Sequence, residues 1–224
     1  MKRYLTLIMG LALALQGCVM NEDLSGGPRY YYHGQDLRFS EQEQLQEIAN
    51  NLETHENECL SNGNGPHCRI AGIFYTDGKS DHKTATGYFA KSCILKDDIG
   101  CRCLGVMFEE GRGVSKDYQS AKEAYELACE FSEGYNCDRL ANLYYDGLGV
   151  RQDFKKAFEI YLKSCDLYNH ISCGFVGLYY EFGQLSVVEK DFKKAKEYYG
   201  KSCDLGSQTG CDNYRRLNEL ELSH

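Results

Sequence analysis

The sequence predicts an all-α protein built from stacked helical repeats, and three observations support this fold class. Cysteines recur in pairs, and the first members of successive pairs lie 34 to 38 residues apart. A repeat length in this range is typical of solenoids. Two apolar patterns with helical spacing recur between the pairs, and two Pro with no Trp favour a helical protein. The pairs are Cys59/Cys68, Cys93/Cys101, Cys129/Cys137, Cys165/Cys173 and Cys203/Cys211.

The first seventeen residues have the features of an export signal. Lys2 and Arg3 precede an apolar run that is shorter than a membrane span. The run ends at Leu15-Gln16-Gly17-Cys18, which resembles a bacterial lipobox. We therefore predict a signal peptide over 1–17 and lipidation of Cys18, which would anchor the protein to the cell envelope, in the periplasm or on the outer surface. The alternative is a secreted protein cleaved nearby, in which Cys18 is a plain thiol.

Residues 18–39 show no helical period, and we expect them to form a flexible tether to a repeat domain over 40–224. The net charge is −8 and becomes −10 without residues 1–17, because that segment holds two positive charges and no negative one. A negative protein is poorly suited to nucleic acid or to anionic lipid surfaces. We therefore expect no nucleic-acid partner, and membrane contact through the N-terminal lipid only.

Each repeat begins with a helix that follows the second cysteine of a pair. An apolar, a very small and an aromatic residue lie three, four and seven places on, and these offsets describe one helix face. A glycine ten places on favours a left-handed helix end. The predicted helices and their final glycines are 68–75 with Gly78, 101–108 with Gly111, 137–144 with Gly147, and 173–180 with Gly183. The small residues are Gly72, Gly105, Ala141 and Gly177.

The second helix of each repeat precedes the next cysteine pair. An Asp starts each run, with Ala four, an aromatic eight and a cysteine twelve places on, so that these side chains share one helix face. The Asp carboxylate is expected to cap the free amides of the first turn. The runs start at Asp81, Asp117, Asp153 and Asp191.

The two ends of the repeat domain follow the same rules. The segment 40–43 is a capping box, and the apolar face after it is typical of the second helix of a degenerate first repeat. The charged segment 213–222, which follows Cys211, is typical of a terminal capping helix. The apolar residues of these two segments are Leu45, Ile48, Ala49 and Leu52, and Leu217, Leu220 and Leu222.

The cysteine pairs, if closed, join the end of one helix hairpin to the start of the next. Closing an eight-residue loop contributes about 2.5 kcal/mol in the chain-entropy model, so that five bridges supply at most roughly 10 kcal/mol. Structural zinc sites favour closer ligands, about two to four residues apart, and the histidines have no matching period. We therefore expect no metal and no cofactor.

Cys103 does not fit the repeat. It lies two residues after Cys101, and residues two apart on a helix point in different directions, so the helical phase pairs Cys101 with Cys93. We predict that Cys103 is a buried free thiol. The alternatives are an intermolecular bridge, a redox centre at Cys101-Arg102-Cys103, or a bond to Cys18 if that residue is not acylated.

Four motifs together resemble the Sel-one-like repeat, in the form found in the Helicobacter cysteine-rich protein family. They are Leu/Val-Gly-x-x-Tyr, Gly-x-Gly-Val, Asp-x-x-x-Ala and the cysteine pairs, and the resemblance covers residues 40–224. It implies a right-handed superhelix of α/α hairpins, an envelope or secreted location, and disulfides within the cysteine pairs. It also implies that penicillin derivatives bind and that β-lactams are hydrolysed slowly, as is described for some members.

The sequence itself favours a binding scaffold. Solenoids present an extended concave surface that recognises a protein or peptide segment. By analogy with related repeats, this face carries the first, fifth and eighth residues after the second cysteine. Asn142 is the best suited, because an amide both donates to and accepts from a peptide backbone. The predicted partner-binding residues, each equally compatible with a plain solvated surface, are Arg102, Glu109, Asp138, Asn142, Tyr145 and Glu181.

A weak β-lactamase or penicillin-binding protein is the alternative, with a β-lactam or peptidoglycan-like ligand. A serine enzyme of this type has Ser-x-x-Lys at a helix start, with Ser-Asp-Asn and Lys-Thr-Gly motifs nearby. Ser80-Asp81-His82-Lys83 is the one match, and the companion motifs are absent from the sequence. No catalytic residue is therefore assigned, and hydrolase activity rests on the family resemblance.

Overall fold

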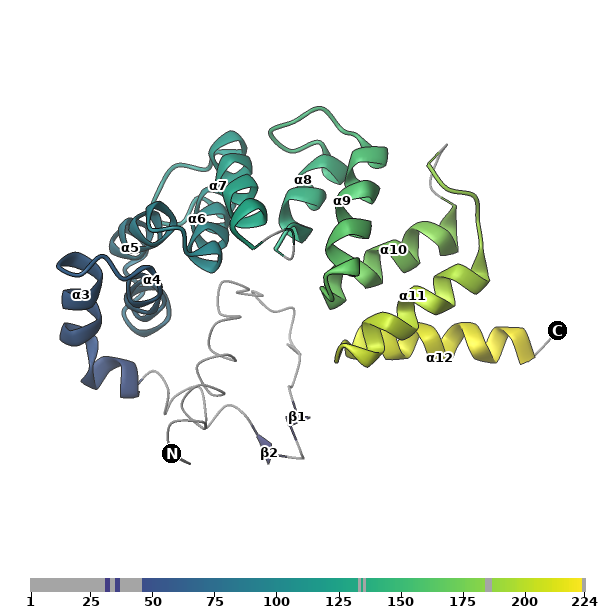
Figure 1. Ribbon diagram of the computed structural model, residues 1–224, viewed down its shortest axis with the longest axis horizontal. Helices are drawn as coiled ribbons and strands as arrows, with labels where there is room; N and C mark the ends of the chain where they lie inside the picture. Colours follow the sequence, from purple (N-terminus) through teal and green to yellow (C-terminus); the bar gives the residue numbers. More distant parts are fainter. Residues whose placement is uncertain are drawn as a thin grey trace. The chain divides into compact units, whose positions relative to one another are not determined.

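The computed structural model describes residues 31–32, 35–36, 46–132, 134, 136–183 and 187–222 (Figure 1). The regular elements in these ranges are helices and one short strand pair. The strands β1 (Tyr31–Tyr32) and β2 (Gln35–Asp36) pair antiparallel within the predicted tether. The predicted signal peptide, Cys18, the capping box and Leu45 lie outside the described residues. The chain divides into two compact units, Met1–Lys116 and Asp117–His224, called unit 1 and unit 2.

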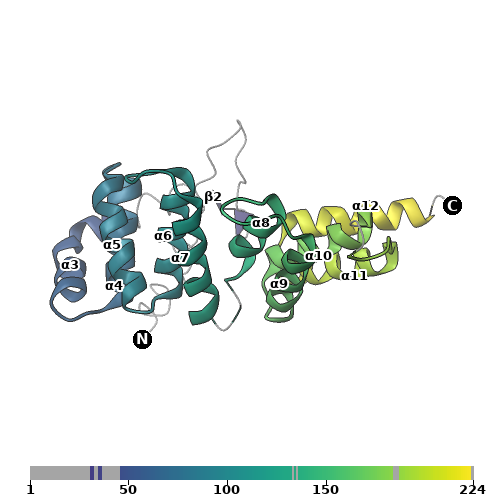
Figure 2. The ribbon, with the colours of Figure 1, turned by 90° about the horizontal axis from the view of Figure 1, so that it is seen from above.

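Both units consist of antiparallel helix hairpins, as predicted, and successive helices within a unit pack against one another. Figure 2 shows the helices of unit 1 side by side. After helical residues 46–50, unit 1 contains α3 (Leu52–Leu60), α4 (Gly65–Ile73), the π-helical turn η1 (Phe74–Gly78), α5 (His82–Ile94) and α6 (Asp98–Glu110). Unit 2 contains α7 (Tyr118–Phe131), α8 (Asp138–Asp146), α9 (Phe154–Asp166), α10 (His170–Phe182), α11 (Phe192–Asp204) and α12 (Gln208–Leu222). The predicted all-α class is confirmed.

The predicted aspartate caps are confirmed at the start of all four second helices. In each, a carboxylate oxygen accepts a hydrogen bond from a backbone N–H in the first helical turn, which satisfies a donor without an intrahelical partner. The bonds run from Thr84 to Asp81, Gln119 to Asp117, Lys156 to Asp153 and Lys194 to Asp191.

The small residue of the first helix lies under the aromatic residue of the second helix. A Cβ atom added to Gly72 would lie 2.6 Å from Cε1 of Phe89, and one added to Gly177 would lie 2.7 Å from the Tyr199 ring. Both rings are buried, and Tyr199 is 0% exposed. The aromatic ring therefore fills the space that a larger side chain would need, which explains the recurring pair.

Glycine ends the first helix in three repeats, as predicted. The exception is the repeat that contains Gly78. The left-handed residues, with φ of 74°, 73° and 66°, are Gly111, Gly147 and Gly183. The prediction for Gly78 is wrong, because the chain continues through η1 and the left-handed residue is Ser80, with φ 54°. This repeat lacks the Gly-x-Gly-Val loop, and its shorter connection is closed by the Lys79 N–H, which donates to the Phe74 carbonyl at 3.2 Å.

Three first helices begin one turn earlier than predicted. Asn64, Asp97 and Asn169 lie four residues before the cysteine, and their side chains cap α4, α6 and α10. By contrast, α8 begins after Cys137, and the corresponding position in its sequence is Glu133, which is not a preferred cap residue. The sequence analysis started each first helix at the second cysteine of a pair, and it therefore missed cap residues that lie before that cysteine.

The two ends of the repeat domain pack as predicted where they are described. Ile48 is buried in a cluster with Ile70 and Phe74, and Ala49 and Leu52 pack against it. At the other end, buried Leu217 of α12 contacts Ala195 and Tyr199 of α11, while Leu220 is 48% exposed. The terminal helices therefore cover the apolar faces of their neighbours.

The structure contains the five disulfides that the resemblance implies. Each joins the end of a second helix to the start of the next first helix, with Cα atoms 4.4 to 4.6 Å apart. They are Cys59–Cys68, Cys93–Cys101, Cys129–Cys137, Cys165–Cys173 and Cys203–Cys211.

The last bridge requires a correction to the predicted position of Cys211. We predicted that the terminal helical segment follows this cysteine, over 213–222, but α12 begins at Gln208 and Cys211 lies inside it. The helix begins earlier because the Ser207 hydroxyl, four residues before the cysteine, accepts a hydrogen bond from the Gly210 N–H at 3.1 Å. Cys203 and Cys211 are both half-buried, whereas each of the other four bridges has at least one buried cysteine. This bridge is therefore the most accessible of the five.

The prediction of a free thiol at Cys103 is wrong. Cys103 is buried at 1% exposure, as predicted, but its sulfur is disulfide-bonded to a partner outside these five pairs. The helical phase excluded Cys103 from its own repeat, but it carries no information about a remote partner.

Candidate partner-binding surface

Aromatic side chains from four helices form one continuous cluster in unit 2. Tyr145 of α8 contacts Tyr179 of α10 edge-on, with ring centroids 6.0 Å apart. Tyr179 contacts Phe158 of α9 at 5.0 Å, and Phe158 contacts Tyr180 at 5.8 Å. Tyr180 stacks on Tyr198 of α11, with centroids 5.7 Å apart and an angle of 12° between the rings. We call these five residues the aromatic cluster.

The aromatic cluster has a buried centre and two half-exposed ends. Phe158 and Tyr179 are buried, whereas Tyr145 at one end and the Tyr180–Tyr198 stack at the other are half-buried. Burial raises the pKa of Tyr179 and of Tyr198. Their hydroxyls therefore stay protonated at neutral pH, and the rings offer uncharged hydrogen-bonding surface next to apolar surface.

Lysine side chains lie over tyrosine rings at equivalent positions of successive repeats. The Nζ atom of Lys156 is 4.1 Å from the Tyr144 ring centroid and donates to the Tyr144 hydroxyl at 2.7 Å. In the next repeat, Nζ of Lys194 is 5.0 Å from the Tyr180 centroid. Such contacts are attractive because the negative face of the ring meets the ammonium charge. Both lysines are exposed at the surface.

The stacked end of the aromatic cluster carries a second ammonium group. Nζ of Lys201 lies 4.5 Å from the Tyr198 centroid and 3.2 Å from a carboxylate oxygen of Glu197. The side chains of this ion pair are 46% and 59% exposed, so that water screens the pair strongly. Half-exposed rings with nearby positive charge suit the acidic and aromatic side chains of a protein segment.

The structure brings two of the predicted binding residues, Asn142 and Tyr145, to the other end of the aromatic cluster. They are three residues apart on α8 and half-buried, and so they share a helix face. The Tyr161 hydroxyl donates to the side-chain oxygen of Asn142. Within the described residues, the Asn142 side-chain nitrogen has no hydrogen-bond partner, and it is therefore available to a ligand carbonyl.

Asp138 and Glu181 are buried, so the prediction that they face a partner is wrong. Asp138 is 2% exposed and accepts a hydrogen bond from Asn169 at 3.5 Å. Glu181 is 4% exposed and accepts from the Tyr199 hydroxyl and from Arg216, both at 2.7 Å. The sequence analysis counted positions within one repeat and therefore missed this burial. Asn169 and Arg216, which contact these carboxylates, belong to the following repeat in each case.

Glu181 links three helices of unit 2 as an ionised carboxylate. Burial raises the pKa of this carboxyl, but the hydrogen bonds from Arg216 and Tyr199 and the Arg216 charge outweigh burial, so that the pKa lies below its ordinary value. Burial raises the pKa of the Tyr199 hydroxyl, and its bond to Glu181 raises it further. The network therefore has a structural role.

The other two predicted binding residues, Arg102 and Glu109, belong to unit 1. Both are half-buried on α6, and seven residues separate them, so they lie on one side of the helix. They are not part of the aromatic cluster, which lies entirely in unit 2. They remain predicted contacts of unit 1.

Unit 1 contains a tyrosine stack that the sequence analysis did not single out. Tyr75 and Tyr88 stack with centroids 5.5 Å apart and an angle of 13° between the rings. Both hydroxyls donate to Oε1 of Glu56, at 2.8 and 2.9 Å. The bond to Glu56 and burial raise the pKa of Tyr75, and burial and the same bond raise that of Tyr88. Tyr75 and Tyr88 occupy the same repeat positions as Tyr180 and Tyr198, and this recurrence could have predicted the stack. The sequence pattern could not have predicted the contact with Glu56.

The serine motif has no catalytic arrangement in the described residues. Ser80 and Lys83 are exposed, at the connection between η1 and α5. Asp81 caps α5 through the Thr84 N–H. Among the described residues, no basic side chain is hydrogen-bonded to the Ser80 hydroxyl to activate it.

A comparison with protein families identifies a repeat family. The model described as Sel1 repeat matches residues 101–130, 137–169 and 170–207. These segments follow the predicted period. The predicted resemblance to Sel-one-like repeats is therefore confirmed.

The chain is also similar to a curated protein named Beta-lactamase HcpA from Helicobacter pylori. The two are 46% identical over 43 residues, which is 19% of this chain and 17% of that protein. The match thus spans less than a fifth of the length of the relative.

Two solved structures share the fold. One is a protective antigen of uropathogenic Escherichia coli that displays an SLR fold, with 24% identity and a TM-score of 0.62, covering 72% of this chain and 35% of that one. The other is a Sel1 repeat protein from Oxalobacter formigenes, with 20% identity and a TM-score of 0.61, covering 74% and 71%. At these identities the likeness concerns the fold alone.

Proposed function

We propose that this chain, in which the Sel1 repeat model matches residues 101–130, 137–169 and 170–207, is an exported scaffold that binds an extended protein segment on the aromatic cluster of unit 2. The observation that carries this proposal is the half-exposed Tyr180–Tyr198 stack, with Lys194 and Lys201 against its rings. Tyrosine and cationic side chains of this kind are typical of binding hot spots. Of this surface, Asn142 and Tyr145 belong to the concave-face positions predicted from the sequence, whereas the Tyr180–Tyr198 stack lies at other positions of the repeat.

The chemistry of the surface favours a segment with acidic and aromatic side chains. A carboxylate of the partner would pair with the ammonium groups of Lys194 and Lys201, while an aromatic side chain would pack on the Tyr198 ring. At the other end of the aromatic cluster, the free amide nitrogen of Asn142 would donate to a backbone carbonyl. An extended segment could use both ends at once.

Peptide selection on the oxidised protein tests the proposal. We expect a random displayed library to enrich peptides that contain acidic and aromatic residues. In Lys194→Glu their affinity, measured by fluorescence anisotropy, should fall about tenfold or more, because like charges then face each other. Lys193→Glu is the matched control, since Lys193 is an adjacent exposed lysine of α11. A library without such enrichment, or equal losses in the two variants, would contradict the proposal.

The disulfides support a location outside the cytoplasm, because such bridges persist in oxidising compartments. Within the described residues, no helix has the length and apolar character needed to cross a membrane. We propose that a lipid on the Cys18 sulfur anchors the protein to the envelope. This anchor and a disulfide at Cys18 exclude each other, and Cys18 is the one cysteine of the sequence outside the five bridges and Cys103. Labelling of cells with a fatty-acid analogue should mark the wild type and not Cys18→Ala, and equal labelling would exclude this anchor.

The β-lactamase alternative has weaker support. It rests on the name of a relative matched over 43 residues, and Ser80 is an exposed turn residue with no activating base among the described residues. Nitrocefin turnover by the purified oxidised protein separates the two functions. A rate above that of a denatured control would favour the enzyme, provided that Ser80→Ala removes it.

A further inference from the structure

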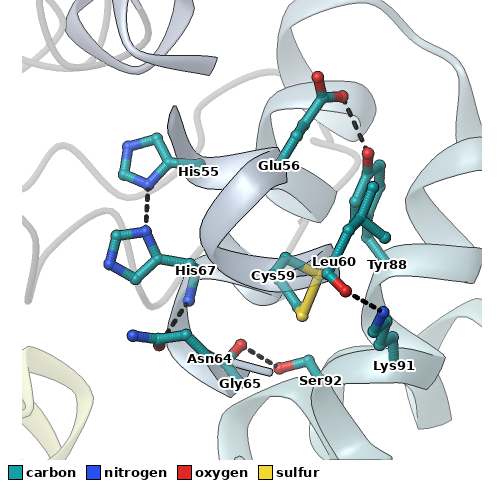
Figure 3. The surroundings of a disulfide bond; sticks show 11 residues. His55, Glu56, Cys59, Leu60, Asn64, Gly65, His67, Tyr88, Lys91 and Ser92 are labelled. Atoms are coloured by element: carbon teal, nitrogen blue, oxygen red, sulfur yellow. Dashed lines mark hydrogen bonds between the residues drawn. A yellow bond between two sulfur atoms is a disulfide. The ribbon is translucent and has the colours of Figure 1, made fainter. Parts of the chain in front are cut away.

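Two histidines of unit 1 lie in contact beside the first disulfide. The Nδ1 atoms of His55 in α3 and His67 in α4 are 3.0 Å apart, and the ring centroids are 4.9 Å apart. Figure 3 shows the two imidazoles facing one another on one side of the Cys59–Cys68 bond, with Glu56 on the other side. Neither histidine takes part in the binding function proposed above.

The backbone around this histidine pair is held in place by covalent and hydrogen bonds. His55 lies one helical turn before Cys59, and His67 directly precedes Cys68, whose Cα atom is 4.6 Å from that of Cys59. The His67 N–H also donates to the side-chain oxygen of Asn64, which caps α4. The two rings are therefore positioned before any ligand arrives, which reduces the ordering cost of binding.

The contact defines how the rings are protonated. Two Nδ1 atoms at hydrogen-bond distance need one donor and one acceptor, so at least one ring is neutral with a free Nδ1 lone pair. If the donating ring moves its proton from Nδ1 to Nε2, both Nδ1 atoms carry a lone pair.

We propose that His55 and His67 form a two-ligand site for a divalent transition metal of the imidazole-binding class, such as Zn²⁺, Ni²⁺ or Cu²⁺. Two nitrogens bound at about 2.0–2.1 Å to one ion lie about 2.8–3.0 Å apart at an angle of 90° and about 3.3–3.4 Å apart at the tetrahedral angle. The observed separation of 3.0 Å fits the 90° arrangement of square-planar or octahedral sites. Imidazole favours these metals, whereas Ca²⁺ and Mg²⁺ favour oxygen ligands.

The surroundings suit a cation that keeps open positions. α3 carries Glu53, Glu56 and Glu58, and its sequence has no Lys or Arg. Both histidines are half-buried, so that a hydrated ion can reach them. No group of three or more potential ligands occurs in the described residues, and water or a donor from a bound molecule would therefore complete the coordination. The sequence analysis did not single out this pair, because the two histidines are twelve positions apart and lie on different helices.

Calorimetric titration of the oxidised, tag-free full chain with NiCl₂ and ZnCl₂ at neutral pH tests this site. We expect one ion per chain, and an affinity about tenfold or more lower in His55→Gln and in His67→Gln, because each variant removes one ligand. His82→Gln is the matched control, since His82 belongs to the same unit and lies outside the pair. Intact mass verifies the disulfides of each variant.

A second measurement keeps the test independent of the variants. In wild-type protein, paramagnetic Ni²⁺ should broaden the imidazole NMR signals of His55 and His67 before those of the other histidines. The site is overturned if no binding is seen at millimolar metal. It is equally overturned if all three variants lose the same affinity, or if the broadening is centred on another histidine.

Discussion

The two units carry the same tyrosine stack in different electrostatic settings. Tyr75–Tyr88 in unit 1 and Tyr180–Tyr198 in unit 2 occupy equivalent repeat positions, with ring centroids 5.5 and 5.7 Å apart. In unit 1, both hydroxyls donate to Glu56. An ammonium group lies against each stack, with Lys79 4.6 Å from the Tyr75 centroid in unit 1 and Lys194 and Lys201 against the rings in unit 2. Within the described residues of unit 2, no carboxylate is hydrogen-bonded to the hydroxyl of Tyr180 or Tyr198.

This difference separates what the repeat determines from what single residues determine. The stack recurs because the equivalent positions lie on faces that meet in two hairpins, between η1 and α5 in unit 1 and between α10 and α11 in unit 2. The charge beside it depends on residues outside the repeat pattern, such as Glu56 from the preceding helix. In unit 1 the Glu56 carboxylate accepts hydrogen bonds from both tyrosine hydroxyls, whereas in unit 2 two ammonium groups lie against the rings and neither hydroxyl has such a carboxylate within the described residues.

Removing one disulfide should lower the free energy of unfolding more than any other change, and the loss should be equal in the two units. Replacing Cys93 and Cys101 by Ser, or Cys165 and Cys173 by Ser, should each lower the free energy of unfolding by about 2–5 kcal/mol. The reason is that both bridges close loops of the same length. Urea unfolding followed by NMR signals from each unit measures this loss of stability. A clearly smaller loss in one unit would show that the repeats do not determine stability equally.

Arg216→Ala should have the next largest effect, and only unit 2 should respond. It leaves the buried Glu181 carboxylate without its cation, which we expect to cost about 2 kcal/mol, less than for a fully buried pair because the Arg216 side chain is 45% exposed.

The same pair should make unit 2 sensitive to acid. The folded pKa of Glu181 is below its ordinary value, so its contribution is complete above the ordinary glutamate pKa of about 4.3 and is lost as the pH falls through the folded pKa. Unfolding of unit 2, followed by NMR at neutral and acid pH, should show this loss in the wild type and not in Glu181→Gln. An unchanged pH dependence in Glu181→Gln would assign the acid sensitivity to other groups.

Removing one tyrosine hydroxyl from each stack should have the smallest effect on stability, and the effect should differ between the two stacks. Tyr88→Phe deletes a donor to Glu56 and should cost about 1 kcal/mol, reduced from the usual value for a charged acceptor because the site is partly exposed. Tyr198→Phe should change stability little, since within the described residues no hydrogen bond of the Tyr198 hydroxyl is present. Urea denaturation of both variants checks this, and equal losses would erase the distinction between the stacks.

Much of the fold follows from local patterns in the sequence. The cysteine period and the Asp, Ala and aromatic offsets predicted the stapled hairpins, the caps at Asp81 and Asp191, and buried rings such as Tyr199. These predictions succeed because helix geometry relates residues three, four, seven and eight apart without reference to the rest of the chain. Within the candidate surface, the same counting identified Asn142 and Tyr145.

The tertiary structure decided what depends on residues far apart in the sequence. Asp138 and Glu181 are buried because later helices cover them, and Cys103 is bonded to a partner outside its repeat. The His55–His67 contact likewise needs two helices brought together by a disulfide. Sequence periodicity predicts which face of a helix a side chain occupies. Only the packing of one helix on the next decides whether that face meets water, a carboxylate or another ring.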